Sequence, residues 1–318
     1  MKMKTESLFI GIDVGGTNTV VGLVDAKGTL LKQARFSTQA QAPITVFFNN
    51  LTQTIRQLTN SDADRIAGIG IGAPSVNSKS GYLENPKNFK WGRIHLSQML
   101  EHHFKRPVKI INDADAAALG ELYFGHGRHL NNFVHITLGT GLGGSIIVNR
   151  QLVSGHDGFA GEFGHTKIEF GDRLCSCGKR GCLETYVSAK GICRTAFELI
   201  SREATDSLLT KYAFENLTPK IIFELANQGD ALAIKTFAVT GRILGSKLAD
   251  LIALLNPEAI IFSGGLTNAG HFLFDPMKKA MEENLLEIHR NSFEIHISDT
   301  QKNFAVLGTA ALMMKRLN

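Results

Sequence analysis

The sequence has few of the features that mark secreted, membrane or nucleic-acid-binding proteins. Its four cysteines among 318 residues are far too few for a disulfide scaffold. No stretch of about 18 apolar residues occurs, and the apolar segment near the N-terminus is interrupted at Asp13, too early for a signal-peptide core. No run of five or six like charges is present either. We therefore expect a soluble cytoplasmic protein with no nucleic-acid or membrane partner.

The composition that remains is that of an ordinary globular protein. Apolar residues make up 43% of the chain, charged residues 20%, and the formal net charge is +5. These values exclude a disordered or fibrous protein. At roughly 100–200 residues per domain, the length indicates about two domains.

The clearest pattern is a repeated strand–glycine turn–strand unit. An apolar segment at residues 8–12 is followed by Asp13, the pair Gly15-Gly16 and a second apolar segment at 20–24. Aligning Asp13 with Thr137, an offset of 124 residues, superposes Gly15 on Gly139 and repeats the same order. Copies this far apart indicate duplicated domains rather than a solenoid.

Hydrophobic periodicity and turn residues predict the secondary structure. We expect strands at 8–12, 20–24, 30–31, 66–71, 108–111, 133–137, 146–148, 259–262 and 293–297, and helices at 44–58, 113–123, through much of 184–255, and at 305–317. The first three strands are expected to form an antiparallel meander. Asn112 is expected to cap the helix at 113–123. We expect the last helix to pack on the first domain, which gives a smaller α/β domain of residues 1–118 plus 300–318 and a larger one of 119–299.

The glycine turns indicate phosphate binding, but not by a dinucleotide fold. Gly139, Gly141 and Gly144 satisfy G-x-G-x-x-G, yet residues 145–148 predict a strand where that fold requires a helix. An NAD-dependent oxidoreductase is therefore excluded, and no P-loop sequence is present. Backbone N–H groups in glycine turns donate to phosphate oxygens, and Asp13 is placed to hold Mg²⁺ beside a nucleotide. The alternative is that both turns are ordinary hairpins.

Three of the four cysteines form a compact cluster with one histidine. His165, Cys175, Cys177 and Cys182 lie within fewer than about twenty residues. They supply the four ligands that tetrahedral zinc prefers and leave no open position, so the predicted zinc is structural and not catalytic. Three reduced thiols beside an unrelated histidine remain the alternative. Cys193 lies outside the cluster and is expected to be a small buried apolar residue.

Taken together, these motifs resemble the ROK family, named for its repressors, open reading frames and kinases, and in particular its glucokinase branch. The matching motifs occur in order at Asp13–Thr17, Asn112-Asp113, Glu162–His165, Cys175–Glu184 and Gly264-Gly265. The resemblance covers the full chain. It implies an α/β fold, the two-domain actin-like ATPase (ribonuclease H-like) sugar kinase fold with a duplicated β-hairpin/α unit. One difference is Asn18, where many members have Lys.

The resemblance also implies an activity and its residues. We expect ATP-dependent phosphorylation of a hexose at its 6-hydroxyl, most simply glucose, with ATP, Mg²⁺ and a structural Zn²⁺, by a homodimer like many relatives. The expected ATP-binding residues are Asp13, Gly15, Gly16, Thr17, Asn18, Thr137, Gly139, Thr140, Gly141, Gly264 and Gly265. The expected hexose-binding residues are Asn88, Asn112, Asp113, Glu162, His165 and Glu184.

Asp113 is the expected catalytic residue, accepting the proton of the 6-hydroxyl. Its position at a helix N-terminus favours the ionised form, so we expect no raised pKa. A plain helix cap is the alternative for Asp113, and solvated surface acids are the alternative for Glu162 and Glu184. Asp115 is expected to be a first-turn acid without chemistry.

Other activities within the family remain open. N-acetylglucosamine, N-acetylmannosamine and fructose are substrates of relatives, so an N-acetylhexosamine kinase or a fructokinase is an alternative. A sugar-responsive transcriptional repressor belongs to a different functional class. Such repressors carry a DNA-binding domain ahead of the kinase-like part, and here the first hairpin begins near residue 9, so a kinase is expected.

Overall fold

The computed structural model describes residues 7–86, 89–203 and 206–317. The chain forms two compact units. The first contains Met1–Asn131, Ser145–Ala160 and Ser298–Asn318, and the second contains Asn132–Gly144 and Gly161–Ile297. These units are defined by packing, and the domain bounds expected from the sequence stay a prediction.

The first unit is built on a five-stranded sheet with the order β3-β2-β1-β4-β7. Its strands are β1 (Leu8–Val14), β2 (Asn18–Asp25), β3 (Leu30–Ser37), β4 (Ile66–Ala73) and β7 (Val108–Asn112). The first three pair antiparallel, which confirms the predicted meander, and β1, β4 and β7 pair parallel. A short hairpin of β5 (Val76–Asn77) and β6 (Tyr82–Leu83) follows β4.

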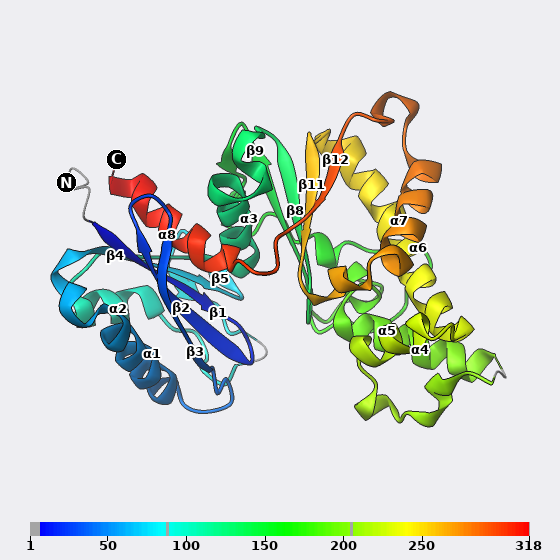
Figure 1. Cartoon of the computed structure of the whole chain (residues 1–318), viewed down its shortest axis with the longest axis horizontal. Helices are drawn as coiled ribbons and strands as arrows, with labels where there is room; N and C mark the ends of the chain where they lie inside the picture. Colours follow the sequence, from blue (N-terminus) through cyan, green and yellow to red (C-terminus); the bar gives the residue numbers. More distant parts are fainter. Residues whose placement is uncertain (1–6, 87–88, 204–205, 318) are drawn as a thin grey trace. The chain divides into compact units, whose positions relative to one another are not determined.

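Helices cover both faces of this sheet because its strands alternate apolar side chains between the two faces. Ile10 and Ile12 face α1 (Ile44–Thr59) and α2 (Leu96–Phe104), whereas Phe9 faces α8 (Phe304–Leu317). Figure 1 shows α1 and α8 on opposite sides of the sheet. Helix α3 (Asp113–Phe124) begins directly after β7 and packs against α8.

The second sheet repeats the arrangement of the first. Its order is β10-β9-β8-β11-β12, formed by β8 (Phe133–Leu138), β9 (Leu142–Val148), β10 (Gln151–Leu152), β11 (Ala259–Ser263) and β12 (Glu294–Ile297). β9 and β10 pair antiparallel, and β8, β11 and β12 pair parallel. Each sheet therefore joins a hairpin to a parallel extension in the same order, as a duplication requires.

The core of the second unit lies between its sheet and a group of helices. These are α4 (Ala189–Arg202), α5 (Pro219–Asn227), α6 (Ala231–Leu255) and α7 (His271–Asn284). Ile136 and Phe262 of the strands pack in one cluster with Leu244 of α6 and Met277 of α7. Among the described residues, none of the helices combines the length and apolar character that crossing a membrane requires.

Candidate active site and metal centre

The first glycine turn joins β1 to β2 and is fixed by hydrogen bonds to two of its carbonyl groups. Gly15 donates its N–H to the carbonyl of Asn18 (3.0 Å), and the Thr38 hydroxyl donates to the Gly15 carbonyl (2.7 Å). Gly16 and Thr17 are exposed. The turn is thus anchored through its carbonyls, and its tip is left exposed, as the binding of a phosphate by backbone N–H groups requires.

Two carboxylates lie at the carboxyl ends of two parallel strands, β1 and β7, which are separated by β4. Asp13 pairs in register with Gly72 of β4, and Asn112 ends β7. The Asn112 side chain accepts a hydrogen bond from the Ala114 N–H (2.8 Å) and so caps α3, as predicted. Asp113, the first residue of α3, accepts from the same N–H (3.0 Å). The sheet thereby brings Asp13 close enough to Asp113 for their charges to interact.

Burial controls the protonation of both carboxylates. The pKa of Asp13 is raised to about 6, chiefly by burial and also by the negative charge of Asp113, against the opposing effect of a hydrogen bond from the Asn303 side chain. Burial also raises the pKa of Asp113, against the hydrogen bond from Ala114. The expectation that the helix N-terminus would leave the pKa of Asp113 unraised is therefore wrong, because loss of solvation outweighs the helix terminus.

Replacing Asp13 by Asn is expected to stabilise the ligand-free protein above pH 6. From pH 3.8 to about 6 the unfolded chain releases the Asp13 proton while the folded chain keeps it. The free energy of unfolding therefore falls as pH rises through this window, by about 3 kcal/mol in total, and levels off above it. Urea denaturation of wild type and Asp13→Asn from pH 4 to 8 measures the difference. The prediction is contradicted if the difference in free energy of unfolding between Asp13→Asn and wild type does not grow with pH. It is also contradicted if the exposed Asp64→Asn shows the same difference.

The second and third glycine turns lie next to each other in the second unit. Gly139 donates its N–H to the Gly141 carbonyl (3.0 Å), which closes the turn between β8 and β9. Gly264 has φ of +94°, and a Cβ there would lie 2.3 Å from the Leu138 carbonyl oxygen. Only glycine fits this position, so the turn after β11 packs directly on the end of β8. The Thr137 and Ser263 hydroxyls, 3.2 Å apart, add a further link.

Glu184 connects these two turns to the segment of residues 175–182, which carries the three clustered cysteines and is called the cysteine-rich segment below. It lies in the 3₁₀-helix η4 (Leu183–Thr185), and its Oε2 accepts the Leu142 N–H (3.0 Å). A Cβ on Gly141 would lie 2.6 Å from the same oxygen, so a larger residue there would displace the Glu184 carboxylate. A residue expected to bind the hexose is thus hydrogen-bonded to the turn expected to bind phosphate.

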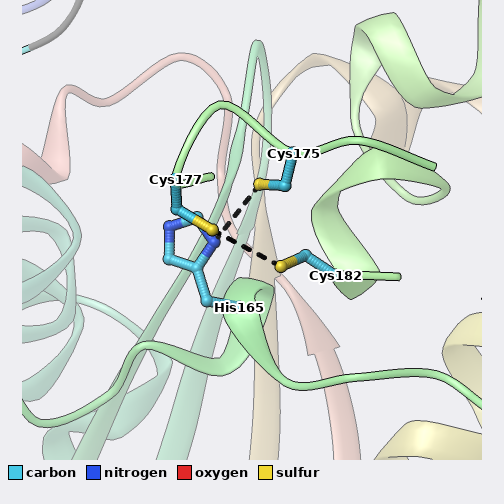
Figure 2. Close-up of side chains that lie close together, drawn as sticks. All are labelled: His165, Cys175, Cys177 and Cys182. Carbon is cyan, nitrogen blue, oxygen red and sulfur yellow. Dashed lines mark hydrogen bonds between the residues drawn. The ribbon is translucent and has the colours of Figure 1, made fainter. Parts of the chain in front are cut away.

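The candidate metal ligands converge in the second unit. Nitrogen and sulfur atoms of His165, Cys175, Cys177 and Cys182 all lie within 4.8 Å of one another. Figure 2 shows the imidazole and the three thiols pointing toward a common centre. Cys175 Sγ is 3.6 Å from His165 Nδ1, Cys177 Sγ is 3.6 Å from Cys182 Sγ, and all are free thiols. One imidazole with three thiols fits a tetrahedral zinc ion in donor type and number.

The other nitrogen of His165 points away from the thiols. His165 lies in η3 (Phe163–His165), and its Nε2 is 3.8 Å from Glu162 Oε2. With Nδ1 facing the cysteines, Nε2 and the Glu162 carboxylate remain outside the metal cluster. This division would let His165 serve in both of its predicted roles, as a metal ligand through Nδ1 and as a hexose contact through Nε2; its contact with the hexose stays a prediction.

The predicted site residues divide between the two units. Asp13, the first turn, Asn112 and Asp113 belong to the first, whereas Glu162, His165, Glu184 and the other two turns belong to the second. Asn88 lies outside the described residues. Sequence reasoning missed Asn303, which also accepts the Val306 N–H (3.0 Å) at the start of α8. A capping signal could have found that bond, but not its contact with Asp13.

Comparison with known proteins places the chain in a family. The sequence model of the ROK family matches residues 9–316. This chain belongs to the ROK family. It is 34% identical to a glucokinase of Halalkalibacterium halodurans, over 98% of this chain and 96% of that protein. A crystal structure of a ROK family glucokinase from Streptomyces griseus with glucose and AMPPNP is 32% identical and superposes with a TM-score of 0.82, over 96% of this chain and 99% of that one.

The similarity confirms the expected fold for this ROK family member, the actin-like, ribonuclease H-like α/β sugar kinase fold. Repressors of the family are also similar. A xylose repressor of Caldicellulosiruptor bescii is 27% identical over 96% of this chain and 77% of the repressor. The two glucokinases named above therefore match this chain at higher identity and over more of their own length than this repressor does.

Proposed function

We propose that this ROK family protein is an ATP-dependent hexose kinase that phosphorylates the 6-hydroxyl, with glucose as its preferred substrate. The observation that carries the proposal is the desolvated carboxyl of Asp113, held at the start of α3 near Asp13 at the carboxyl end of the parallel strands β1, β4 and β7. Phosphoryl transfer to an alcohol needs a residue that orients the hydroxyl and accepts its proton, and Asp113 is offered for that role. The identity with glucokinases over nearly the full chain supports the same activity.

In the proposed reaction Asp113 is the general base. As the 6-hydroxyl oxygen attacks the γ-phosphorus of ATP, its proton passes to the Asp113 carboxylate. The bond from the γ-phosphorus to the bridging oxygen breaks, and ADP leaves. Because this transition state is loose, positioning and charge neutralisation matter more than base strength. A pKa raised by burial still improves the match between the base and neutral pH.

The glycine turns are proposed to bind the nucleotide. The turns at Gly15-Gly16 and Gly139–Gly141 would donate N–H groups to the phosphates, and Gly264-Gly265 would contact the adenosine. Asp13 offers a carboxylate for Mg²⁺, directly or through water, and a bound Mg²⁺ would neutralise phosphate charge. The binding of a cation there would also favour the ionised form of Asp13, whose pKa burial raises.

The hexose is proposed to bind Asn112, Glu162, His165 and Glu184 through its ring hydroxyls, with Asn88 as a further contact. His165, Cys175, Cys177 and Cys182 would hold a structural zinc ion. The zinc would supply rigidity rather than chemistry, because four protein ligands leave no open position. It would thereby fix the segment that runs from Glu162 to Glu184, including the two carboxylates at its ends.

A coupled ATP-consumption assay across glucose, N-acetylglucosamine, N-acetylmannosamine and fructose tests the proposal. We expect ADP formation with the highest kcat/KM for glucose. The advantage over close analogues is expected to be about 10–200-fold, since a small group in a pocket is worth about 1–3 kcal/mol. Absence of turnover with every sugar, together with specific DNA binding in a gel shift, would contradict the kinase and favour a repressor.

A further inference from the structure

One arginine next to the cysteine-rich segment is almost fully buried and makes five hydrogen bonds. The Arg173 side chain is only 8% exposed. Its Nε and Nη2 donate to the two carboxylate oxygens of Glu198 (2.9 and 2.8 Å), and Nη2 also donates to the Thr195 hydroxyl (3.0 Å). Nη1 donates to the carbonyls of Thr185 (2.8 Å) and Gly191 (3.2 Å). The guanidinium thus joins the cysteine-rich segment to η4 and to α4.

An aromatic ring completes this environment. The guanidinium carbon of Arg173 lies 4.0 Å from the centre of the Tyr186 ring. The Tyr186 hydroxyl oxygen in turn accepts the N–H groups of Asp172 (3.1 Å) and Arg173 (3.3 Å). Lysine could not reproduce these contacts, because they use the planar, forked geometry of the guanidinium.

These contacts bear directly on Glu184. Glu184 lies between Cys182, a candidate metal ligand, and Thr185, whose carbonyl accepts from Arg173. Thr185 also donates its N–H (2.9 Å) and its hydroxyl (2.7 Å) to the Cys182 carbonyl. The short helix η4 is therefore held at one end by the cysteine–histidine cluster and at the other by Arg173.

The position of η4 determines where the Glu184 carboxylate lies. Its Oε2 is already bound to the Leu142 N–H (3.0 Å). Within that constraint, a shift of the η4 backbone would move Oε1, the oxygen left for a ligand. Displacements near 1 Å at a positioning group are enough to weaken binding and catalysis markedly.

We propose that Arg173 is a positioning residue for hexose binding, which orients Glu184 through the Thr185 carbonyl independently of the metal. For its ligand, this inference rests on the proposed hexose kinase function. Arg173 itself touches no substrate. Its contribution is a second attachment of η4, built from a bidentate carboxylate, two carbonyls, a hydroxyl and an aromatic ring.

The test compares Arg173→Met with Glu198→Gln, a milder change that keeps the guanidinium. Lys235→Met is the matched control, since it removes a cation from a more exposed ion pair in the same unit, with Glu203 (2.6 Å). Three quantities are measured on the full-length, metal-loaded protein. They are the steady-state constants for glucose, the zinc content, and the hydrogen exchange of the Thr185, Tyr186 and Val187 amides, which bond within η4 and just after it.

For Arg173→Met we expect the KM for glucose to rise about 10-fold with kcat within about 2-fold, because contacts made equally in ground and transition states are lost. Exchange of the three amides should accelerate while zinc content stays at the wild-type value. Glu198→Gln should change the same quantities in the same direction by less, which keeps the test available if Arg173→Met does not fold. Lys235→Met should change none of them.

Three results would overturn the inference. The first is unchanged KM and exchange in both variants. The second is loss of zinc in parallel with faster exchange, which would mean that Arg173 acts only through the metal site. The third is faster exchange with unchanged KM, which would mean that the role of Arg173 is purely structural. If wild type turns over no hexose, the kinase proposal fails, and the exchange and zinc measurements still decide whether Arg173 holds η4.

Discussion

Asp113→Asn is expected to lower kcat by about 10²–10⁴-fold, the usual contribution of a general base. The amide matches the carboxylate in shape, and its oxygen can keep the hydrogen bond from the Ala114 N–H. It cannot accept the proton of the 6-hydroxyl. The affinity for an ATP analogue should survive, because Asp113 makes no proposed contact with the nucleotide. Steady-state kinetics with glucose and calorimetric titration with the analogue measure the two effects separately.

Asp115→Asn is the matched control for this substitution. Asp115 lies in the same first turn of α3, is 7% exposed, and accepts a hydrogen bond from the Ser145 hydroxyl (2.8 Å). An amide oxygen can accept that bond too, so turnover should stay within a few-fold of wild type. Near wild-type turnover by Asp113→Asn would remove Asp113 from the mechanism. Equal losses in both variants would point to a packing effect on α3.

The second large effect is expected at the cysteine–histidine cluster. Metal analysis should find about one zinc ion per chain, and Cys177→Ala should lose it. Structural zinc supplies on the order of 10 kcal/mol of folding free energy in small zinc domains. Loss of one of four ligands should therefore destabilise the second unit by several kcal/mol and raise the KM for hexose, since Glu162 and Glu184 flank the cluster. Thermal unfolding and kinetics with and without added zinc measure both effects.

Cys193→Ala is the control outside the cluster. Cys193 is 5% exposed, and its thiol lies 3.3 Å from the Leu217 carbonyl oxygen in the helical core. Its replacement should leave zinc content and KM unchanged and cost only a small loss of packing. A zinc-free protein with full activity would defeat the structural zinc. If Cys193→Ala also lost its zinc, the loss in Cys177→Ala could not be assigned to the removal of a metal ligand.

Much of the fold could be predicted from the sequence because the duplication is local and regular. The glycine turns following Asp13 and Thr137, each between apolar runs, predicted two hairpins, and the structure confirms both. Helix α7 was not predicted. Pro276 lies inside it, and an internal proline removes a backbone donor and is a strong signal against a helix. Packing against α6 overrides that preference.

The candidate site was predictable only where its residues stand close in the sequence. The cluster of His165 and the three cysteines could be found because its ligands share one segment. By contrast, the contact of Asn303 with Asp13 joins residues from opposite ends of the chain, and no local pattern indicates it. The expectation about the pKa of Asp113 was wrong for the same reason. The direction of the pKa shift depends on how much solvent the surrounding fold removes from the carboxyl, and the residues next to Asp113 in the sequence do not specify this.

The placement of α8 has a consequence for how the protein forms on the ribosome. Phe9 and Val24 of the first unit are covered by Val306 and Met313 of this helix. The residues that close that core are thus synthesised after the second unit, which is complete once Ile297 has emerged. Nascent domains usually finish in order from the N-terminus. Here the order is reversed, so one apolar face of the sheet that is made first stays uncovered until α8 has been synthesised.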